Sequence, residues 1–140
     1  MEGRRVLVID NEDDAMRVCV ELLINEGYEV YSTADIKSGM DMVKNLLPDM
    51  VIMDLHLPET NGIEGLRRIK NLKEETLIVL VTSRGTMDTV KEAMRHGAYD
   101  YITKPFDIEL VKDVINEGLK MSPITDRLNK PPKQHGQMRR

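Results

Sequence analysis

Residues 49–62 of this chain read DMVIMDLHLPETNG, so that four apolar residues run directly into the carboxylate of Asp54. An apolar run of this length is typical of a strand that is buried on both faces in the middle of a parallel sheet. Asp54 would then lie where the strand leaves the core, and ligands of open α/β sheets bind at that carboxyl end. The stretch therefore predicts a central strand and a candidate reactive group.

Four further segments have the composition of strands. Residues 6–9 and 77–81 are apolar throughout, whereas residues 28–32 and 99–103 alternate between apolar and polar side chains. Apolar residues at helical spacing follow each strand, which predicts an α/β fold with a parallel sheet covered by five helices on both faces. The continuous runs should be central and the alternating ones should be edges wet on one face. With right-handed crossovers, the order 2-1-3-4-5 of a flavodoxin-like doubly wound sheet meets both conditions.

Single residues predict the ends and faces of the first two helices. Asp13 or Asp14 is available to cap the first helix, and Gly27 is available to end it. Val18 belongs to the apolar stripe of the first helix, and Leu47 belongs to the stripe of the second. We expect both of these apolar side chains to pack against the sheet.

Length and charge divide the chain into two parts. Its 140 residues are enough for one domain with a core and too few for two. The net charge of −4 combines −8 over residues 1–122 with +4 over residues 123–140. We expect a domain over residues 1–121 and a basic, proline-containing tail or linker over residues 122–140. The acidic body argues against direct nucleic-acid binding by this segment.

Cysteine content and hydropathy indicate the compartment. The single cysteine, Cys19, cannot form an internal disulfide, and its place on an apolar helical stripe predicts a buried, inert thiol. No apolar run approaches the roughly 20 residues of a membrane span. We therefore expect a cytoplasmic protein that does not engage a membrane.

The predicted strand order brings chemically useful side chains to one edge of the sheet. The chain direction reverses between the first and third strands, which leaves a crevice above their carboxyl ends. Residues 10–12, Asp-Asn-Glu, would line one side of this crevice and Asp54 the other. Thr82 and Lys104 end the next two strands. The end of the second of these strands lies roughly 10 Å from that of the Asp54 strand, and a lysine and an aspartate side chain that reach toward each other can close such a gap.

Clustered carboxylates of this kind predict a bound cation. Mg²⁺ usually binds through one or two carboxylates, water and a phosphoryl oxygen. A carboxylate held beside such an ion and a lysine can attack phosphorus, because both cations offset the negative charge of the incoming group. The expected product is an aspartyl phosphate on Asp54.

These motifs together resemble a response-regulator receiver domain of two-component signalling, over about residues 4–121. Residues 97–106, GAYDYITKPF, match the family especially closely. The family's acidic pair falls on Asp10 and Asn11, its phosphoacceptor on Asp54, its later Pro and Gly on Pro58 and Gly62, its hydroxyl residue on Thr82, its switch aromatic on Tyr101, and its Lys-Pro pair on Lys104-Pro105.

The resemblance implies a phosphorelay. A sensor histidine kinase or phosphotransfer protein would phosphorylate Asp54, and Thr82 and Lys104 would contact the phosphoryl oxygens. Tyr101 would then rotate inward and remodel the face made by the fourth helix, fifth strand and fifth helix. That face would control an effector protein or an output domain, or form a homodimer. The protein would catalyse only its own Mg²⁺-dependent phosphorylation and dephosphorylation.

The resemblance also implies a ligand set and residues that adjust the reaction. Mg²⁺ would be held by Asp10, Asn11, Asp54 and the backbone carbonyl of His56, with Glu12 as a further candidate. The side chains of His56 and Arg84 would tune hydrolysis of the phosphoryl group, although solvated loop side chains account for them equally well. Pro105 is a candidate for a cis peptide bond. Tyr101 could serve core packing as well as switching.

Asn11 departs from the family, which usually has a metal-ligating acid at this position. A neutral amide predicts weaker Mg²⁺ binding than is normal for the family, but not its loss. It also keeps open a phosphorylation-independent pseudo-receiver that acts as a protein-binding module. A phosphatase with an aspartyl-phosphate intermediate is a third hypothesis, but such hydrolases usually have an acid where this chain has His56. The chain could be a stand-alone receiver or a fragment of a longer regulator.

Overall fold

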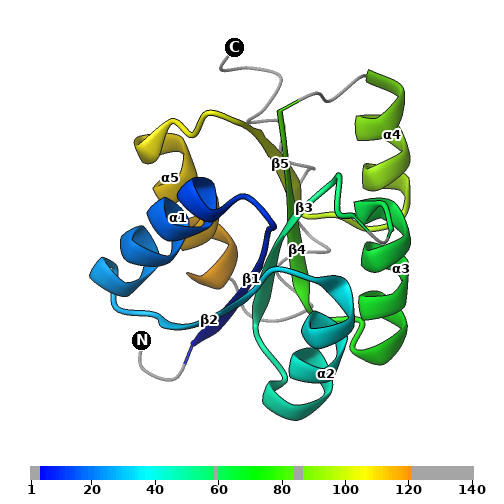
Figure 1. Cartoon of the computed structure of the whole chain (residues 1–140), viewed down its shortest axis with the longest axis horizontal. Helices are drawn as coiled ribbons and strands as arrows, with labels where there is room; N and C mark the ends of the chain where they lie inside the picture. Colours follow the sequence, from blue (N-terminus) through cyan, green and yellow to red (C-terminus); the bar gives the residue numbers. More distant parts are fainter. Residues whose placement is uncertain (1–3, 59, 84–86, 121–140) are drawn as a thin grey trace.

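The computed structural model describes residues 4–58, 60–83 and 87–120. The elements in chain order are β1 (Arg5–Ile9), α1 (Asp13–Asn25), β2 (Glu29–Thr33), α2 (Ile36–Leu46), β3 (Met50–Asp54), α3 (Gly62–Leu72), β4 (Leu77–Thr82), α4 (Met87–Arg95), β5 (Asp100–Thr103) and α5 (Ile108–Lys120). The five strands form one parallel sheet in the order β2-β1-β3-β4-β5, which confirms the predicted topology (Figure 1).

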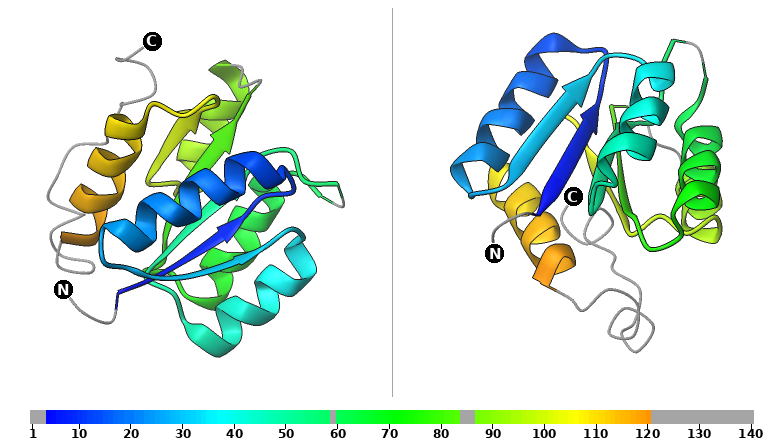
Figure 2. Two further views of the ribbon diagram at one scale, coloured as in Figure 1. Left: turned by 60° about the vertical axis from the view of Figure 1, so that its left-hand side comes forward. Right: turned by 90° about the horizontal axis from the view of Figure 1, so that it is seen from below.

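Helices cover both faces of this sheet, as the alternating pattern predicted. The helices α1 and α5 lie on one face, and α2, α3 and α4 lie on the other (Figures 1 and 2). Each layer has its own apolar core: Leu7 and Met53 pack with α2 and α3, whereas Val8 and Ile52 pack with α1 and α5. Neighbouring side chains of one central strand therefore belong to different cores, which explains why β1, β3 and β4 need continuous apolar runs.

The two edge strands differ in a way that the sequence pattern did not predict. Strand β2 is partly exposed along its length, as expected for an edge. In β5, however, Asp100, Tyr101 and Ile102 are all buried, so the prediction of a wet face was wrong. Tyr101 packs in the core beneath α4, and Ile102 packs in the core beneath α5. Helices thus cover β5 from both sides, although it lies at the sheet edge.

Three predictions about the helices were wrong in detail. Neither Asp13 nor Asp14 caps helix α1, because the N-cap is Glu12, whose side chain makes no capping hydrogen bond. Asp13 and Asp14 lie in the first turn, where their negative charge interacts favourably with the helix dipole. Val18 and Leu47 are exposed and do not pack against the sheet. Leu47 is the C-cap of α2 with φ of 49°, so the chain has already turned away from the helix axis there.

The end of α1 follows the prediction. Gly27 has φ of +96°, a left-handed conformation that glycine adopts without steric cost. Among the described residues, the structure contains no helix with the length and hydropathy of a membrane span.

Candidate functional site

Asp54 is the last residue of β3 and lies between the ends of β1 and β4. Its side chain is buried, with the whole residue 5 % exposed. The backbone N–H of His56 donates to Oδ1 of Asp54 at 2.9 Å, which fixes the rotation of the carboxylate. The other oxygen, Oδ2, faces Nζ of Lys104 at 3.0 Å. Asp54 is thus held by one oxygen and presents the other at the carboxyl edge of the sheet.

The loop after Asp54 turns back very close to it. The N–H of Gly62 donates to the carbonyl of Leu55 at 2.6 Å. A Cβ at position 62 would lie 2.8 Å from Cα of Leu55 and 3.0 Å from the carbonyl oxygen of Asp54, closer than side chains pack. A glycine is therefore required for α3 to begin beside the strand end. The side chain of Asn61 caps this helix by accepting from the N–H of Glu64 at 2.9 Å.

Lys104 brings a positive charge to the same place. It follows the end of β5, where its N–H donates to the carbonyl of Thr82 at 2.8 Å and its peptide bond to Pro105 is cis. Its ammonium lies 2.9 Å from Oδ2 of Asp10, 2.6 Å from Oε1 of Glu12 and 3.0 Å from Oδ2 of Asp54. Carboxylates from the ends of β1 and β3 therefore meet the ammonium of a lysine that follows β5.

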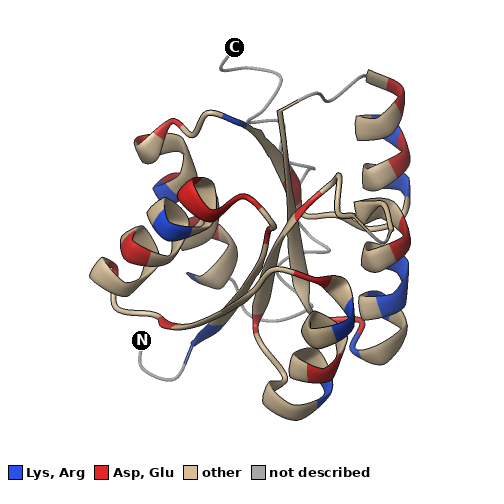
Figure 3. Cartoon of the chain, in the orientation of Figure 1, with Lys and Arg blue, Asp and Glu red and all other residues tan. Residues whose placement is uncertain are grey.

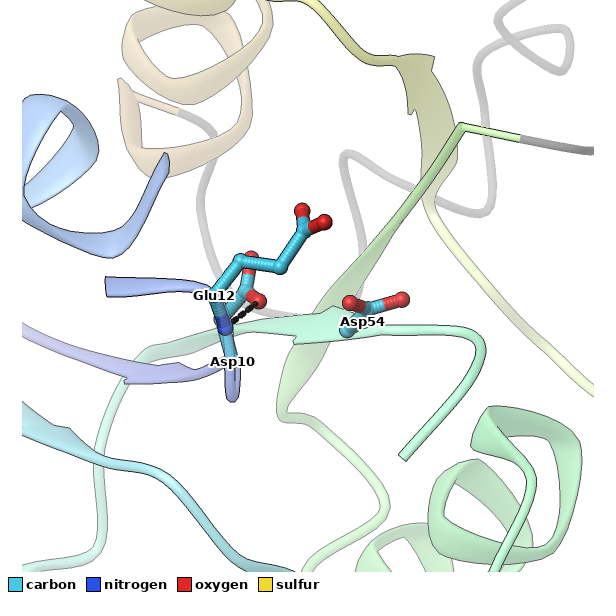
Figure 4. Close-up of side chains that lie close together, drawn as sticks. All are labelled: Asp10, Glu12 and Asp54. Atoms are coloured by element: carbon cyan, nitrogen blue, oxygen red, sulfur yellow. Dashed lines mark hydrogen bonds between the residues drawn. The ribbon is translucent and has the colours of Figure 1, made fainter. Parts of the chain in front are cut away.

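The three carboxyl groups also lie close to one another. One oxygen from each of Asp10, Glu12 and Asp54 falls within 4.8 Å of the others (Figure 4). The N–H of Glu12 donates to Oδ1 of Asp10 at 2.9 Å, which folds the turn after β1 toward Asp54. Figure 3 shows how acidic residues gather along this turn and the start of α1. Oxygen donors from carboxylates are the ligands that hard divalent cations prefer, so this donor set fits a metal ion.

Burial and pairing act differently on the groups of this cluster. Burial raises the pKa of Asp10, and the hydrogen bond from Lys104 lowers it only in part. Burial alone would lower the pKa of Lys104, but hydrogen bonds to Glu12, Asp10 and Asp54 outweigh it and raise that pKa above its usual value. The ammonium therefore stays charged, while the buried carboxylate of Asp10 is held ionised at a cost.

The remaining predicted site residues occupy distinct places. Thr82 is buried at the end of β4, next to Thr103 of β5. Tyr101 is buried in the core, and His56 is exposed beside Asn61. Arg84, predicted to tune hydrolysis, lies outside the described residues.

Three further residues, two in the turn before α1 and one on that helix, complete the set. Asn11 is exposed, whereas the carboxylate of the next residue, Glu12, reaches the cluster. The family resemblance implied Glu12 only as a further candidate ligand, and its spacing of two residues from Asp10 is the sequence signal for this placement. Cys19 is buried, as predicted, and burial raises the pKa of its thiol to about 12.

Comparison with known proteins agrees with this geometry. The sequence profile of the response regulator receiver domain matches residues 6–116. Chemotaxis protein CheY of Thermotoga maritima is 32 % identical over 116 residues, which cover 82 % of this chain and 97 % of CheY. Regulatory protein AtoC of Escherichia coli (strain K12) is 29 % identical over 117 residues, which cover 84 % of this chain but 25 % of AtoC.

A solved structure extends the likeness to three dimensions. The beryllofluoride-activated NtrC4 receiver domain dimer superimposes with a TM-score of 0.79 at 26 % identity, covering 83 % of this chain and 96 % of that chain. This chain thus spans a quarter of AtoC but nearly all of CheY and of the NtrC4 receiver domain. Receiver domains generally use Mg²⁺, and the cluster of Asp10, Glu12 and Asp54 could bind such an ion. The chain belongs to the receiver domains of two-component response regulators.

Proposed function

We propose that this protein is a phosphoacceptor module that receives a phosphoryl group on Asp54 from a sensor histidine kinase or phosphotransfer protein. The observation that carries this proposal is the contact of Asp54 Oδ2 with the ammonium of Lys104 at 3.0 Å, beside Asp10 and Glu12. A carboxylate paired with a cation at the carboxyl edge of a parallel sheet can accept an electrophilic phosphorus.

In the proposed reaction an oxygen of Asp54 forms a bond to phosphorus as the bond to the donor's histidine nitrogen breaks. The nitrogen keeps the bonding electron pair and takes up a proton. The N–H of His56 orients the attacking carboxylate, and Lys104 neutralises charge on the phosphoryl oxygens. Mg²⁺ held by Asp10, Glu12 and Asp54, with Asn11 and the carbonyl of His56 as further candidates, would supply additional charge neutralisation.

The proposed output is a change in the face made by α4, β5 and α5. Thr82 would contact the phosphoryl group, and the buried ring of Tyr101 would repack beneath α4. The two helices of this face each begin with a large exposed apolar residue, Met87 on α4 and Ile108 on α5, which a partner could cover. An effector protein, an output domain or a second copy of the chain would read it. The protein would act on no substrate beyond its own aspartyl phosphate.

The test is incubation with acetyl phosphate and Mg²⁺, followed by intact mass spectrometry. We expect the wild type to gain the mass of one phosphoryl group and Asp54→Asn to gain none. Asp41→Asn, which removes an exposed carboxylate on α2, is the matched control and should be phosphorylated like the wild type. An unmodified wild type would overturn the proposal and favour a module that binds partners without phosphorylation. Turnover of phosphate esters would instead indicate a phosphatase.

A further inference from the structure

We infer that Glu12 supplies the metal-binding carboxylate that Asn11 lacks, and that Glu12 exchanges between Lys104 and the metal ion. This inference rests on the proposed function only in taking the cluster as the metal site of a phosphoacceptor. The third carboxylate of the site would then come from Glu12, the N-cap of α1, and not from position 11, where the family usually has an acid.

The backbone of that turn places the two neighbouring residues differently. The N–H of Glu12 bonds to Oδ1 of Asp10 at 2.9 Å, so the chain folds back and the Glu12 side chain extends over Asp10 (Figure 4). Its carboxylate then lies within 4.8 Å of those of Asp10 and Asp54. Asn11, at the apex, is exposed. The longer side chain of Glu12 thus restores a third negative charge where an amide alone would leave two.

Lys104 indicates that these oxygens converge on one cationic position. Its ammonium lies between 2.6 and 3.0 Å from an oxygen of each of the three carboxyl groups, and its shortest contact is with Glu12. Carboxyl groups that merely lay near one another on the surface would not all direct an oxygen to the same cation. The ammonium marks the point at which the cluster is most negative.

The exposure of the three carboxyl groups differs, and this decides which of them can move. The side chains of Asp10 and Asp54 are 3 % and 8 % exposed, whereas that of Glu12 is 57 % exposed. Glu12 can therefore release Lys104 and turn toward another cation without leaving a buried charge unpaired. Lys104, once released by Glu12, is free to follow the phosphoryl group on Asp54.

The test is a Mg²⁺ titration by isothermal calorimetry in the absence of any phosphodonor, with Mn²⁺ binding by electron paramagnetic resonance as a second readout. The proteins are wild type, Glu12→Gln, Asn11→Asp and the double variant. We expect Glu12→Gln to weaken Mg²⁺ binding about tenfold, equivalent to one good polar contact. In the Asn11→Asp background the same change should cost less than about threefold, because the new carboxylate at position 11 would then be the third of the site.

Asp13→Asn is the matched control. Asp13 follows Glu12 directly, carries the same charge, is exposed and lies outside the cluster. This substitution should weaken binding less than about twofold, as expected for a screened surface charge. Equal losses in Glu12→Gln and Asp13→Asn, or equal costs of Glu12→Gln in both backgrounds, would overturn the inference. Unchanged or tighter Mg²⁺ binding by Glu12→Gln would also overturn it, because Glu12 would then serve only as a partner of Lys104.

The outcome is separable from that of the phosphorylation test. Tenfold weaker Mg²⁺ binding by Glu12→Gln together with an unphosphorylated wild type would overturn the phosphoacceptor proposal and leave the ligand assignment standing. Phosphorylation of Asp54 with unchanged Mg²⁺ affinity in Glu12→Gln would overturn the ligand assignment and leave the phosphoacceptor proposal standing. Urea unfolding of each variant verifies that the titrated protein is folded.

Discussion

At the amino ends of β1, β2 and β3, charged side chains are matched in pairs and stay partly exposed. Nε of Arg5 lies 3.4 Å from Oε2 of Glu29, and the N–H of Arg5 donates to Oδ2 of Asp49 at 2.8 Å. Arg4 approaches the other oxygen of Asp49 at 4.0 Å. Glu29 and Asp49 thus each have a donor of their own, and their partly exposed side chains also remain accessible to water.

At the carboxyl ends of the strands, carboxylates outnumber the cations that face them. Asp10, Glu12 and Asp54 share the ammonium of Lys104, and two of these three carboxyl groups are buried. Burial of like charges costs stability, which is the usual condition of a site prepared to bind a cation or to react. The same residue types therefore form separate pairs at one end of the sheet, whereas at the other end three carboxylates share one cation.

The largest expected effect comes from removing the shared cation. Lys104→Ala should lower the free energy of unfolding at pH 7 by about 3 kcal/mol, because buried carboxylates lose their partner. Urea unfolding in EDTA measures this loss. Lys73→Ala, which removes an exposed contact to the carbonyl of Leu47 and a partly buried one to that of Pro48, should cost less than about 1 kcal/mol. Equal losses in the two variants would contradict the comparison.

The same lysine predicts a pH dependence. Because the pKa of Lys104 is raised on folding, its contribution to stability should be complete below its unfolded pKa of 10.5 and be lost as the pH rises through the folded value. Lys104→Ala should not show this alkaline loss. Mg²⁺ should recover part of the stability of Lys104→Ala, since it binds the folded carboxylates.

A glycine substitution tests how tightly the reactive end is packed. Gly62→Ala should lower the free energy of unfolding by about 2 kcal/mol, because the backbone of Leu55 and Asp54 leaves no room for a Cβ. Gly27→Ala meets no atom within 4 Å and should cost about 1 kcal/mol through its positive φ alone. Phosphorylation should slow only in Gly62→Ala. If Gly62→Ala were the milder change, the close approach beside Asp54 would not constrain the site.

Neutralising one carboxylate at each end should give effects of opposite sign. Asp10→Asn should raise the free energy of unfolding at pH 7 by roughly 1 kcal/mol, whereas Asp49→Asn should lower it by roughly half as much. Because the pKa of Asp10 is raised on folding, Asp10 of the folded wild type takes up a proton at a higher pH than Asp10 of the unfolded chain. The gain from Asp10→Asn should therefore fade as the pH drops through the raised value toward 3.8. Destabilisation by Asp10→Asn at neutral pH would count against a strained cluster.

The smallest effect belongs to the exposed pair at the amino end. Glu29→Gln removes the partner of Arg5 where both side chains are more than two-fifths exposed. We expect the free energy of unfolding to fall by less than about 0.5 kcal/mol, and by still less in roughly 0.5 M salt. Thermal unfolding at two salt concentrations measures this. A loss comparable to that in Lys104→Ala would show that the two ends do not differ.

The fold and the position of Asp54 followed from the sequence because they depend on local patterns. Continuous apolar runs predicted the central strands, and Asp54 directly follows one of them. The wet face of β5 was predicted wrongly because the pattern does not show that α4 and α5 cover both of its sides. Leu47 was wrongly predicted to pack against the sheet, because the spacing of apolar residues does not reveal that α2 ends just before it.

The sequence placed residues 10–12 beside the crevice, but it did not predict that Glu12 rather than Asn11 joins the carboxylate cluster. Which of two neighbouring side chains turns inward depends on the backbone of a three-residue turn, set here by the hydrogen bond from the N–H of Glu12 to Asp10. Periodicity carries no information about such a turn. The meeting of Lys104 and Asp54, by contrast, depends only on strand order and strand length.

The most direct test of the central claim locates the phosphoryl group chemically. After reaction with acetyl phosphate and Mg²⁺, borohydride reduces an aspartyl phosphate to homoserine, and peptide mass spectrometry identifies the converted residue. The account predicts homoserine at position 54 in the wild type, with Asp10 unchanged. Conversion of another aspartate, or no conversion in a protein that binds Mg²⁺, would contradict it.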